Sequence, residues 1–464
     1  MKKFLLSIAL VLIYTGVPFA AERPNVVMVL IDALRKDHVS AYGYERKTTP
    51  VIDSLANDGL LFENAFSQST FTNMSLPCIF TSKYPFQISS TRMGAQAGAK
   101  DSGFARLPDN LTTLAQALSD NGYLTGCISN TVFISESTGL WRGFNKTNYL
   151  KQAKADKAID TAIGFIRDSR ASDKGRPFFA YIHLMDVHEP TNPPKPYDTM
   201  YPTLDSAPHN AKQQRWDYVN ATDLDSKGFA VFKSHKLALY DGGLTYADAQ
   251  IGRLVDYLKK ENLYDNTVFI ITADHGEEFW EHAAVEKQYH TDNIGRYGVG
   301  HGHTLFRELQ EVPLVFSGKG VPKSRVKQMV RSIDIMPTIL GLAGVKTAPK
   351  MEGVDLIGSL RRKELKDIPI FCESQVKGAP MVSLQDTRYK YIRLQQAGGA
   401  VEFLFDKSKD YGETDNVAGK YPEIRKAMAA QVDKIRAAPA APRAKPMKID
   451  KDALEKLKSL GYIQ

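Results

Sequence analysis

The feature that most constrains the fold is an alternation of short apolar segments with amphipathic ones. Continuous apolar, β-rich runs recur along the chain, at residues 25–31, 123–128, 178–184, 267–272 and 312–316. Between them, residues 111–120 and 244–263 carry apolar side chains at helical spacing. Strands that are apolar on both faces belong in a parallel sheet covered by helices. The pattern therefore predicts an α/β fold: a doubly wound, mostly parallel sheet with helices on both faces and ligands at the carboxyl ends of its strands.

The two ends of the chain differ from this central pattern. Lys2 and Lys3 precede an apolar run too short to span a bilayer, and small residues follow, which predicts a signal peptide over residues 1–21. We therefore expect an exported protein, periplasmic or secreted, with no transmembrane domain in the mature chain. Residues 22–345 would form a catalytic domain, in which the polar segment 189–236 is an insertion on the substrate side.

Residues 346–464 are predicted to form a smaller C-terminal α+β subdomain. Strand signals occur at 382–384 and 389–394, a helix begins at Tyr421, and an Ala/Pro/Lys linker at 437–448 precedes a last short helix.

Composition excludes several classes of protein. The chain has 464 residues, of which 43% are hydrophobic and 24% charged, values typical of globular proteins. Its three cysteines are too few for a disulfide scaffold or a four-cysteine zinc module. The net charge of +8 favours an anionic substrate, and no dense basic run indicates nucleic-acid binding.

Side chains able to bind a metal follow the predicted strands. Asp32 comes directly after the first strand, Asp274 and His275 come just after the strand at 267–272, and His183 lies near the end of the strand at 178–184. Taken singly, an aspartate at a strand end is more often a helix cap or a turn residue. Together, two carboxylates and an imidazole predict a site for one divalent cation: Ca²⁺, Mg²⁺, Mn²⁺ or Zn²⁺.

Hydroxyl groups cluster around the start of a further predicted helix, at Thr70, Thr72 and Ser75. Backbone N–H groups at a helix start favour anions, and a metal-bound threonine can ionise and attack phosphorus or sulfur. A helix cap is the local alternative for Thr72. His188, His301 and His303 fall in two further polar segments, where they could bind substrate oxygens or protonate a leaving group.

These motifs, in this order, resemble the sulfatase family of the alkaline phosphatase superfamily. The resemblance covers nearly the whole chain after the signal peptide, at residues 32–43, 49–62, 72–85, 183–190, 274–277, 301–313 and 405–418. It implies that Asp32, Asp274 and His275 bind one divalent metal ion, and that Thr72 is a nucleophile forming a covalent intermediate that water resolves. His188 and His301 would contact the transferred group and the leaving oxygen. We further assign Thr70, His183 and His303 to substrate binding.

The chain departs from the sulfatase pattern at the nucleophile. Sulfatases usually mature a cysteine or serine to formylglycine, with proline and arginine two and four positions further on. Here Thr72 is followed by Met74 and Leu76 at those positions, so no formylglycine is expected. A threonine nucleophile resembles instead the phosphodiesterases and phosphoethanolamine transferases of the same superfamily.

Three functions therefore remain open. The leading one is an exported, metal-dependent hydrolase of sulfate or phosphate esters, with phosphorus favoured. The second is a phosphoethanolamine-type headgroup transferase acting on envelope glycans, and the third is a non-catalytic metal-binding envelope protein. The expected partner is an anionic ester: a sulfated or phosphorylated glycan, lipid or small molecule. Product analysis separates the first two, and metal retention without turnover would indicate the third.

Overall fold

A computed structural model describes residues 23–88, 106–151, 153–204, 224–289, 291, 297–345, 349–374, 379–439 and 455. The predicted signal peptide lies outside these residues, as do most of the predicted linker and last helix. Within the described ranges, the helices fall short of the combined length and apolar character that crossing a bilayer requires.

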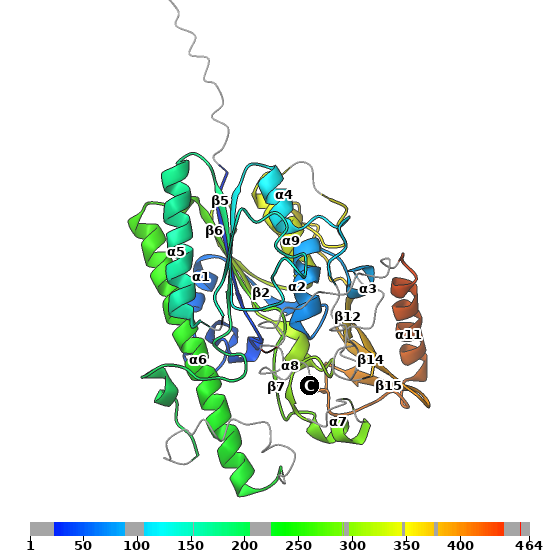
Figure 1. Ribbon diagram of the computed structural model, residues 1–464. Helices are drawn as coiled ribbons and strands as arrows, with labels where there is room; N and C mark the ends of the chain where they lie inside the picture. Colours follow the sequence, from blue (N-terminus) through cyan, green and yellow to red (C-terminus); the bar gives the residue numbers. More distant parts are fainter. Residues whose placement is uncertain are drawn as a thin grey trace, which may run out of the picture.

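The centre of the molecule is a 9-stranded sheet in which most neighbouring strands are parallel (Figure 1). Its order is β11-β2-β10-β6-β1-β5-β3-β4, with β9 paired to β2, and β9 and β10 run antiparallel to their neighbours. The strands are β1 (Asn25–Ile31), β2 (Leu60–Phe66), β3 (Leu124–Ser129), β4 (Lys146–Tyr149), β5 (Phe178–Leu184), β6 (Thr267–Thr272), β9 (Glu311–Val312), β10 (Leu314–Gly318) and β11 (Ser324–Arg331).

Helices cover both faces of this sheet. On one face lie α1 (Pro50–Asp58), α5 (Ala155–Ser172) and α6 (Lys227–Lys260); on the other lie α2 (Thr72–Thr81), α4 (Leu114–Asp120) and α9 (Ile335–Leu342) (Figure 1). Shorter helices are α3 (Pro85–Ile88), α7 (Ala283–Tyr289), α8 (Arg307–Gln310) and α10 (Leu356–Arg361), and 3-10 turns occur at Lys36–His38, Ser40–Tyr42, Tyr197–Thr199, Tyr264–Asn266 and Ser332–Asp334.

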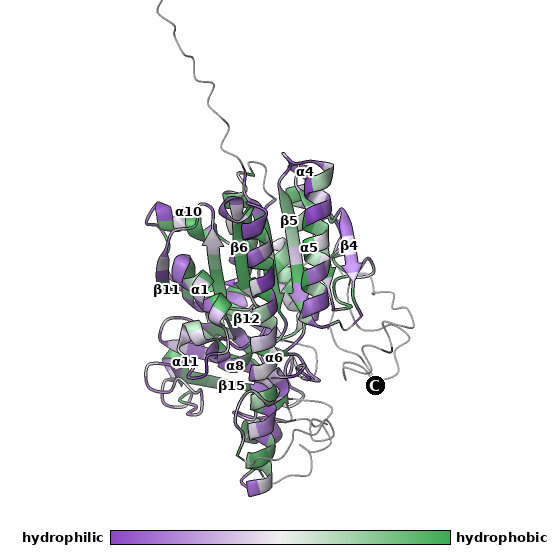
Figure 2. Ribbon diagram, turned by 90° about the vertical axis from the view of Figure 1, so that its left-hand side faces the viewer, coloured by the Kyte–Doolittle hydropathy of each residue, from purple (hydrophilic) through white to green (hydrophobic). Residues whose placement is uncertain are grey.

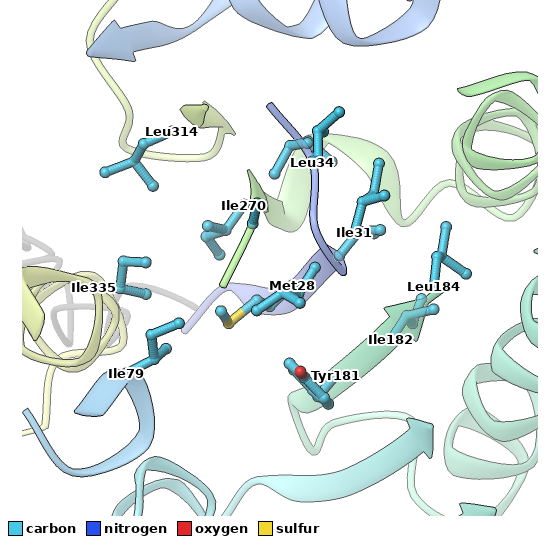
Figure 3. Close-up of a cluster of buried hydrophobic side chains, with 14 of the residues drawn as sticks. Met28, Ile31, Leu34, Ile79, Tyr181, Ile182, Leu184, Ile270, Leu314 and Ile335 are labelled. Carbon is cyan, nitrogen blue, oxygen red and sulfur yellow. The ribbon is translucent and has the colours of Figure 1, made fainter. Parts of the chain in front are cut away.

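The main core lies between the sheet and these helices. All seven residues of β1 are buried, as expected for a strand flanked by parallel neighbours and covered on both faces. Figure 3 shows Met28 of β1 surrounded by apolar side chains that include Ile79 of α2, Tyr181 of β5 and Ile335 of α9. This packing holds the strand ends and the start of α2 in place.

A second sheet follows in the C-terminal part of the chain. It is antiparallel, in the order β12 (Ile370–Ser374), β13 (Met381–Gln385), β14 (Tyr389–Gln396) and β15 (Gly399–Asp406), and α11 (Pro422–Arg436) packs against β13 and β14. A small two-stranded sheet, β7 (Glu278–Phe279) with β8 (Val299–Gly300), lies near this region (Figure 1). The expected fold class is confirmed, while the domain boundaries near residues 21 and 345 stay predictions.

Three elements differ from the sequence-based expectation. The predicted strand at 312–316 is split into β9 and β10 at Pro313, which has no N–H for a ladder. The helix expected from residue 111 begins at Leu114, because Thr113 and Gln116 form a capping box. The helix expected from residue 244 begins at Lys227, where Ser226 caps it. Its first turns extend beyond the sheet (Figure 2) and bury Phe229 and Phe232 against Trp280, a packing partner that the local sequence does not indicate.

Candidate active site

Polar side chains gather at the carboxyl ends of three neighbouring strands. β5, β1 and β6 lie side by side and run parallel, so their carboxyl ends meet at one edge of the sheet. Asp32 directly follows β1, His183 is the penultimate residue of β5, and Asp274 comes shortly after β6. Open α/β sheets bind their ligands at this edge.

Asp32, Asp274 and His275 form a buried group whose potential metal-ligand atoms all lie within 4.8 Å of one another. Nε2 of His275 is 3.3 Å from Oδ2 of Asp274 and 3.8 Å from Oδ1 of Asp32. Nδ1 of His275 lies 2.8 Å from the carbonyl oxygen of Gly276 and donates to it, so Nε2 keeps a lone pair. Oδ1 of Asp32 has no hydrogen-bond partner among the described residues. This donor set, with its unpartnered buried oxygen, fits a divalent cation.

The two carboxylates differ in their protonation. Burial alone would raise the pKa of Asp32, but the charge of His188 and the hydrogen bond with His183 outweigh it and hold that pKa at about 2. Burial and the neighbouring charge of Asp32 raise the pKa of Asp274. A cation bound between them would stabilise the ionised form of both.

His183 contacts Asp32 through the carboxylate oxygen Oδ2. Its Nε2 lies 2.9 Å from Oδ2 of Asp32, and its Nδ1 lies 2.8 Å from the hydroxyl of Tyr181. Tyr181 and His183 are two residues apart on β5, so their side chains share one face of the strand. This chain of hydrogen bonds orients Asp32 in the way that outer partners orient metal ligands. The contacts of His183 indicate a positioning role, and its predicted contact with substrate stays a prediction.

The hydroxyl of Thr72 reaches the same group. Thr72 is the first residue of α2, and its Oγ1 lies 3.0 Å from Nε2 of His275. One turn later, the hydroxyl of Ser75 donates to Oδ2 of Asp274 at 3.3 Å. All 10 residues of α2 are buried, which fixes the start of the helix against the strand ends. Backbone N–H groups and the positive end of the helix dipole favour an anion in front of Thr72.

Two further imidazoles lie beside this contact. The ring centres of His275 and His301 are 4.3 Å apart, and those of His301 and His188 are 5.0 Å apart. Nδ1 of His188 is 2.6 Å from the carbonyl oxygen of Glu189, to which it donates. Nδ1 of His301 lies 3.3 Å from a carboxylate oxygen of Glu277. His188 and His301 thus lie next to the imidazole that contacts Thr72, and their predicted contacts with the transferred group and the leaving oxygen stay predictions.

Thr70 and His303 are both predicted to bind substrate, but their side chains contact residues outside the Asp32, Asp274 and His275 group. Thr70 donates to the carbonyl oxygen of Thr304 at 2.9 Å. Nε2 of His303 lies 3.2 Å from Glu278 and 3.0 Å from Glu286, in a separate buried cluster. These contacts do not bring either side chain to the Thr72 hydroxyl.

Sequence reasoning missed several residues near the site. Tyr181 could have been found from its two-residue spacing to His183 on a predicted strand. Lys236 of α6 gave no local signal, because it lies in a polar segment with weak periodicity. Its ammonium group contacts the carboxylate of Glu189. Burial lowers the pKa of Lys236 to about 8, although Glu277 opposes this shift.

A helix start that presents a hydroxyl beside a buried carboxylate–imidazole group, at the carboxyl edge of the sheet, has the parts of an α/β enzyme site. Comparison with known proteins gives the family. Residues 24–345 match the family described as Sulfatase, and residues 295–438 match N-sulphoglucosamine sulphohydrolase, C-terminal. The chain belongs to the Sulfatase family, whose members are sulfuric ester hydrolases, and the resemblance of its motifs to that family is confirmed.

Curated relatives match over most of their length. A Delta 4,5-hexuronate-2-O-sulfatase from Bacteroides thetaiotaomicron is 24% identical, over 88% of this chain and 87% of its own. Arylsulfatase K from Homo sapiens is 24% identical, over 87% of this chain and 81% of its own.

Solved structures share the fold at lower identity. A protein in complex with its substrate D-glucosamine-2-N,6-O-disulfate has a TM-score of 0.69 at 18% identity, covering 89% of this chain and 97% of that one. The phosphonate monoester hydrolase of Agrobacterium radiobacter has a TM-score of 0.67 at 20% identity, covering 89% and 96%.

Proposed function

We propose that this member of the Sulfatase family is an exported, divalent-metal-dependent hydrolase of an anionic ester, with Thr72 as its nucleophile. We favour phosphorus over sulfur as the atom attacked. The observation that carries the proposal is the 3.0 Å contact between Oγ1 of Thr72 and Nε2 of His275, inside a buried group suited to a cation.

The chain's own residues would hold the cation and keep its ligands in place. Asp32, Asp274 and His275 would bind it, His183 would orient Asp32, and Ser75 would orient Asp274. The bound cation would supply a Lewis acid that lowers the pKa of the Thr72 hydroxyl and offsets the charge of the ester oxygens. An imidazole ligand favours Zn²⁺ over Ca²⁺ or Mg²⁺.

The reaction would proceed in two displacements at Thr72. In the first, the Thr72 hydroxyl gives up its proton and its oxygen forms a bond to the phosphorus. The bond between phosphorus and the bridging ester oxygen breaks, and that oxygen takes up a proton, giving phosphothreonine and the free alcohol. In the second, water attacks the phosphorus, the bond to the threonine oxygen breaks, and the hydroxyl regains a proton. His188 and His301 would give the proton to the leaving alcohol and accept one from the attacking water.

The identity of the nucleophile favours phosphorus. Hydrated formylglycine carries two hydroxyls on one carbon, and the second can expel sulfate after the first has been sulfated. Threonine has a single hydroxyl, so a sulfated threonine would need direct hydrolysis by water. Met74 and Leu76 are both buried at the positions where maturation of a sulfatase would require proline and arginine. We therefore propose that the enzyme works without formylglycine.

A sulfate ester on a sugar is the second candidate substrate. The observation that favours it is the family assignment, together with similarity to a hexuronate-2-O-sulfatase over most of both chains. In both cases we propose an anionic ester of a glycan or a small molecule.

We also propose that the protein is exported to the periplasm or secreted. This proposal rests on the basic residues, the short apolar run and the small residues within 1–21. Amino-terminal sequencing of the protein recovered from cell fractions tests it. A mature chain beginning near residue 22 outside the cytoplasm is expected, and an intact cytoplasmic chain would contradict the proposal.

A panel of 4-nitrophenyl esters tests the reaction. The sulfate, the phosphate monoester, a phosphodiester and a phosphonate monoester are each incubated with purified protein loaded with Zn²⁺, Mn²⁺, Mg²⁺ or Ca²⁺. We expect phosphorus esters to turn over fastest. Thr72→Ala should lose at least about 10⁴-fold of kcat/KM, whereas Thr72→Ser, which keeps a hydroxyl, should retain most of it.

Each other outcome rejects a named part of the proposal. Sulfate turnover that depends on Thr72 would reject the preference for phosphorus. Undiminished activity in Thr72→Ala would reject the nucleophile. Absence of hydrolysis, combined with transfer of a phospho-headgroup from lipid to a glycan, would replace hydrolysis with the transferase function.

A further inference from the structure

We propose that a second divalent transition-metal ion, of the Zn²⁺ type, binds to Glu278, Glu286 and His303. These residues form a buried group outside the active site, and their potential ligand atoms all lie within 4.8 Å of one another. Glu278 belongs to β7, Glu286 to α7, and His303 to the loop that follows β8. The metal would therefore join three segments that are separate in the sequence.

The small β7–β8 sheet separates this group from the active site. Glu277 and Glu278 are adjacent in the segment that enters β7, and adjacent side chains in extended backbone point to opposite sides. Glu277 contacts His301 of the active site, whereas Glu278 contacts His303. Gly302, between the two histidines, has a φ of 82°, so the chain turns there and sends His301 and His303 into different surroundings.

The spacing of the ligand atoms fits tetrahedral coordination. Nε2 of His303 lies 3.2 Å from Oε2 of Glu278 and 3.0 Å from Oε1 of Glu286. Zn²⁺ bonds of about 2.0–2.2 Å in a tetrahedron place neighbouring ligand atoms about 3.3–3.6 Å apart. An outward movement of a few tenths of an ångström would admit the ion.

Three acidic side chains are packed together with two imidazoles around this group. Glu278, Glu286 and Glu308 are three carboxylates with fully buried side chains. Oε2 of Glu308 has no hydrogen-bond partner among the described residues. Glu278 is shared with a second potential ligand group, formed with His282 and Glu308. A buried carboxylate is stable only when it is protonated, paired or bound to a metal, and here several are packed together.

Metal binding there would tie the active-site loop to the C-terminal subdomain. His303 lies two residues from His301, so holding His303 limits where His301 can lie. On the other side, Nε2 of His282 lies 3.0 Å from the carbonyl oxygen of Gly412, in the segment after β15. The proposed site would thus have a structural role.

Metal stoichiometry tests this proposal. Purified protein is loaded with Zn²⁺, dialysed, and analysed by mass spectrometry of its metals and by circular dichroism. We expect Glu286→Gln and His303→Asn to lose one equivalent relative to the wild type. Glu281→Gln, the same change in the same segment, should lose none, because Glu281 pairs with Arg35 outside the group.

A second measurement leaves the proposed site intact. Asp32→Asn combined with Asp274→Asn removes carboxylates of the active-site group only, and we expect this variant to bind one Co²⁺ with the visible absorption of a tetrahedral complex. Absence of Co²⁺ binding there, or full Zn²⁺ retention in folded Glu286→Gln, would overturn the proposal in favour of carboxylates that share protons. Loss of one equivalent in Glu286→Gln is expected whether or not Asp32 binds metal, so the two metal proposals can fail separately.

Discussion

Two buried clusters of histidine and carboxylate lie on either side of the β7–β8 sheet. The active-site cluster is Asp32, Asp274 and His275, and the second cluster is Glu278, Glu286 and His303. The first is open to the hydroxyl of Thr72, 3.0 Å from His275, and to the imidazoles of His188 and His301. The second is lined by a further pair, His282 and Glu308, 2.8 Å apart.

The difference between the clusters lies in what surrounds them. Both contain two carboxylates and one imidazole, so the ligand types alone would not separate catalysis from structure. Only the first lies, among the described residues, where a buried helix start brings a hydroxyl against the imidazole of the group. We therefore expect that removing a ligand of the first cluster lowers kcat/KM without lowering the free energy of unfolding. Removing a ligand of the second cluster should lower the free energy of unfolding.

The largest expected effect is on activity, from Asp274→Asn. Losing this carboxylate should lower kcat/KM by at least about 10³-fold, since metal-ion catalysis supplies several kcal/mol. In buffer containing EDTA, the midpoint of thermal unfolding should stay the same or rise. Burial, and then the charge of Asp32, raises the pKa of Asp274, so its ionised form is destabilising. A variant that loses stability as well as activity would break the comparison.

The second effect is on stability, from His303→Ala. Removing this imidazole leaves Glu278 and Glu286 buried together without their partner, which should cost about 3–5 kcal/mol of unfolding free energy. Urea unfolding followed by circular dichroism measures this cost. Glu286→Gln keeps the shape and one hydrogen bond, so its cost should be smaller, about 1–3 kcal/mol. Wild-type stability in His303→Ala would assign the second cluster no structural role.

The third effect separates His301 from His303, two residues apart. His301→Ala should lower kcat/KM by about 10²-fold, as expected for loss of a proton donor. The loss should grow as the pKa of the leaving alcohol rises, because a poor leaving group depends more on protonation. A series of aryl esters with different leaving groups measures this slope. An equal loss for every ester would indicate that His301 only positions the substrate.

The smallest effect concerns Lys236, whose ammonium group contacts Glu189, the residue after His188. Its pKa of about 8 means that the ammonium group is charged below pH 8 and neutral above it. If this charge attracts the anionic substrate, kcat/KM should fall as the pH rises through about 8. Lys236→Met should remove that limb of the pH profile and lower kcat/KM below pH 8 by about fivefold, since a screened charge pair contributes ~1 kcal/mol.

A matched control is Lys233→Met, one turn earlier on α6. Burial also lowers the pKa of Lys233, but the charges that act on it are those of Glu281, Arg35 and Glu278. If kcat/KM of Lys236→Met still fell as the pH rose through about 8, Lys236 would have no specific role. The same would follow if Lys233→Met lost this fall as well.

Much of the fold follows from local sequence. The observed bounds of β1, β5 and β6 agree with the apolar runs, because strands buried on both faces tolerate few polar residues. β2 and β11 were not predicted. Their sequences, LLFENAF and SRVKQMVR, mix polar and apolar residues, and only pairing with each other and with their neighbours makes them strands.

The sequence by itself determined the strand ends that carry Asp32, Asp274 and His275, and the helix start that carries Thr72. These features are local: an apolar run followed by polar residues, and hydroxyls before an apolar helix. Only the tertiary structure decided which side chains share a site. His301 and His303 stand in the same short Gly-His-Gly-His segment, yet the turn at Gly302 and the pairing of β7 with β8 separate them. The physical reason is that a side chain's contacts depend on the backbone that other, distant segments hold in place, and residue type alone does not encode that placement.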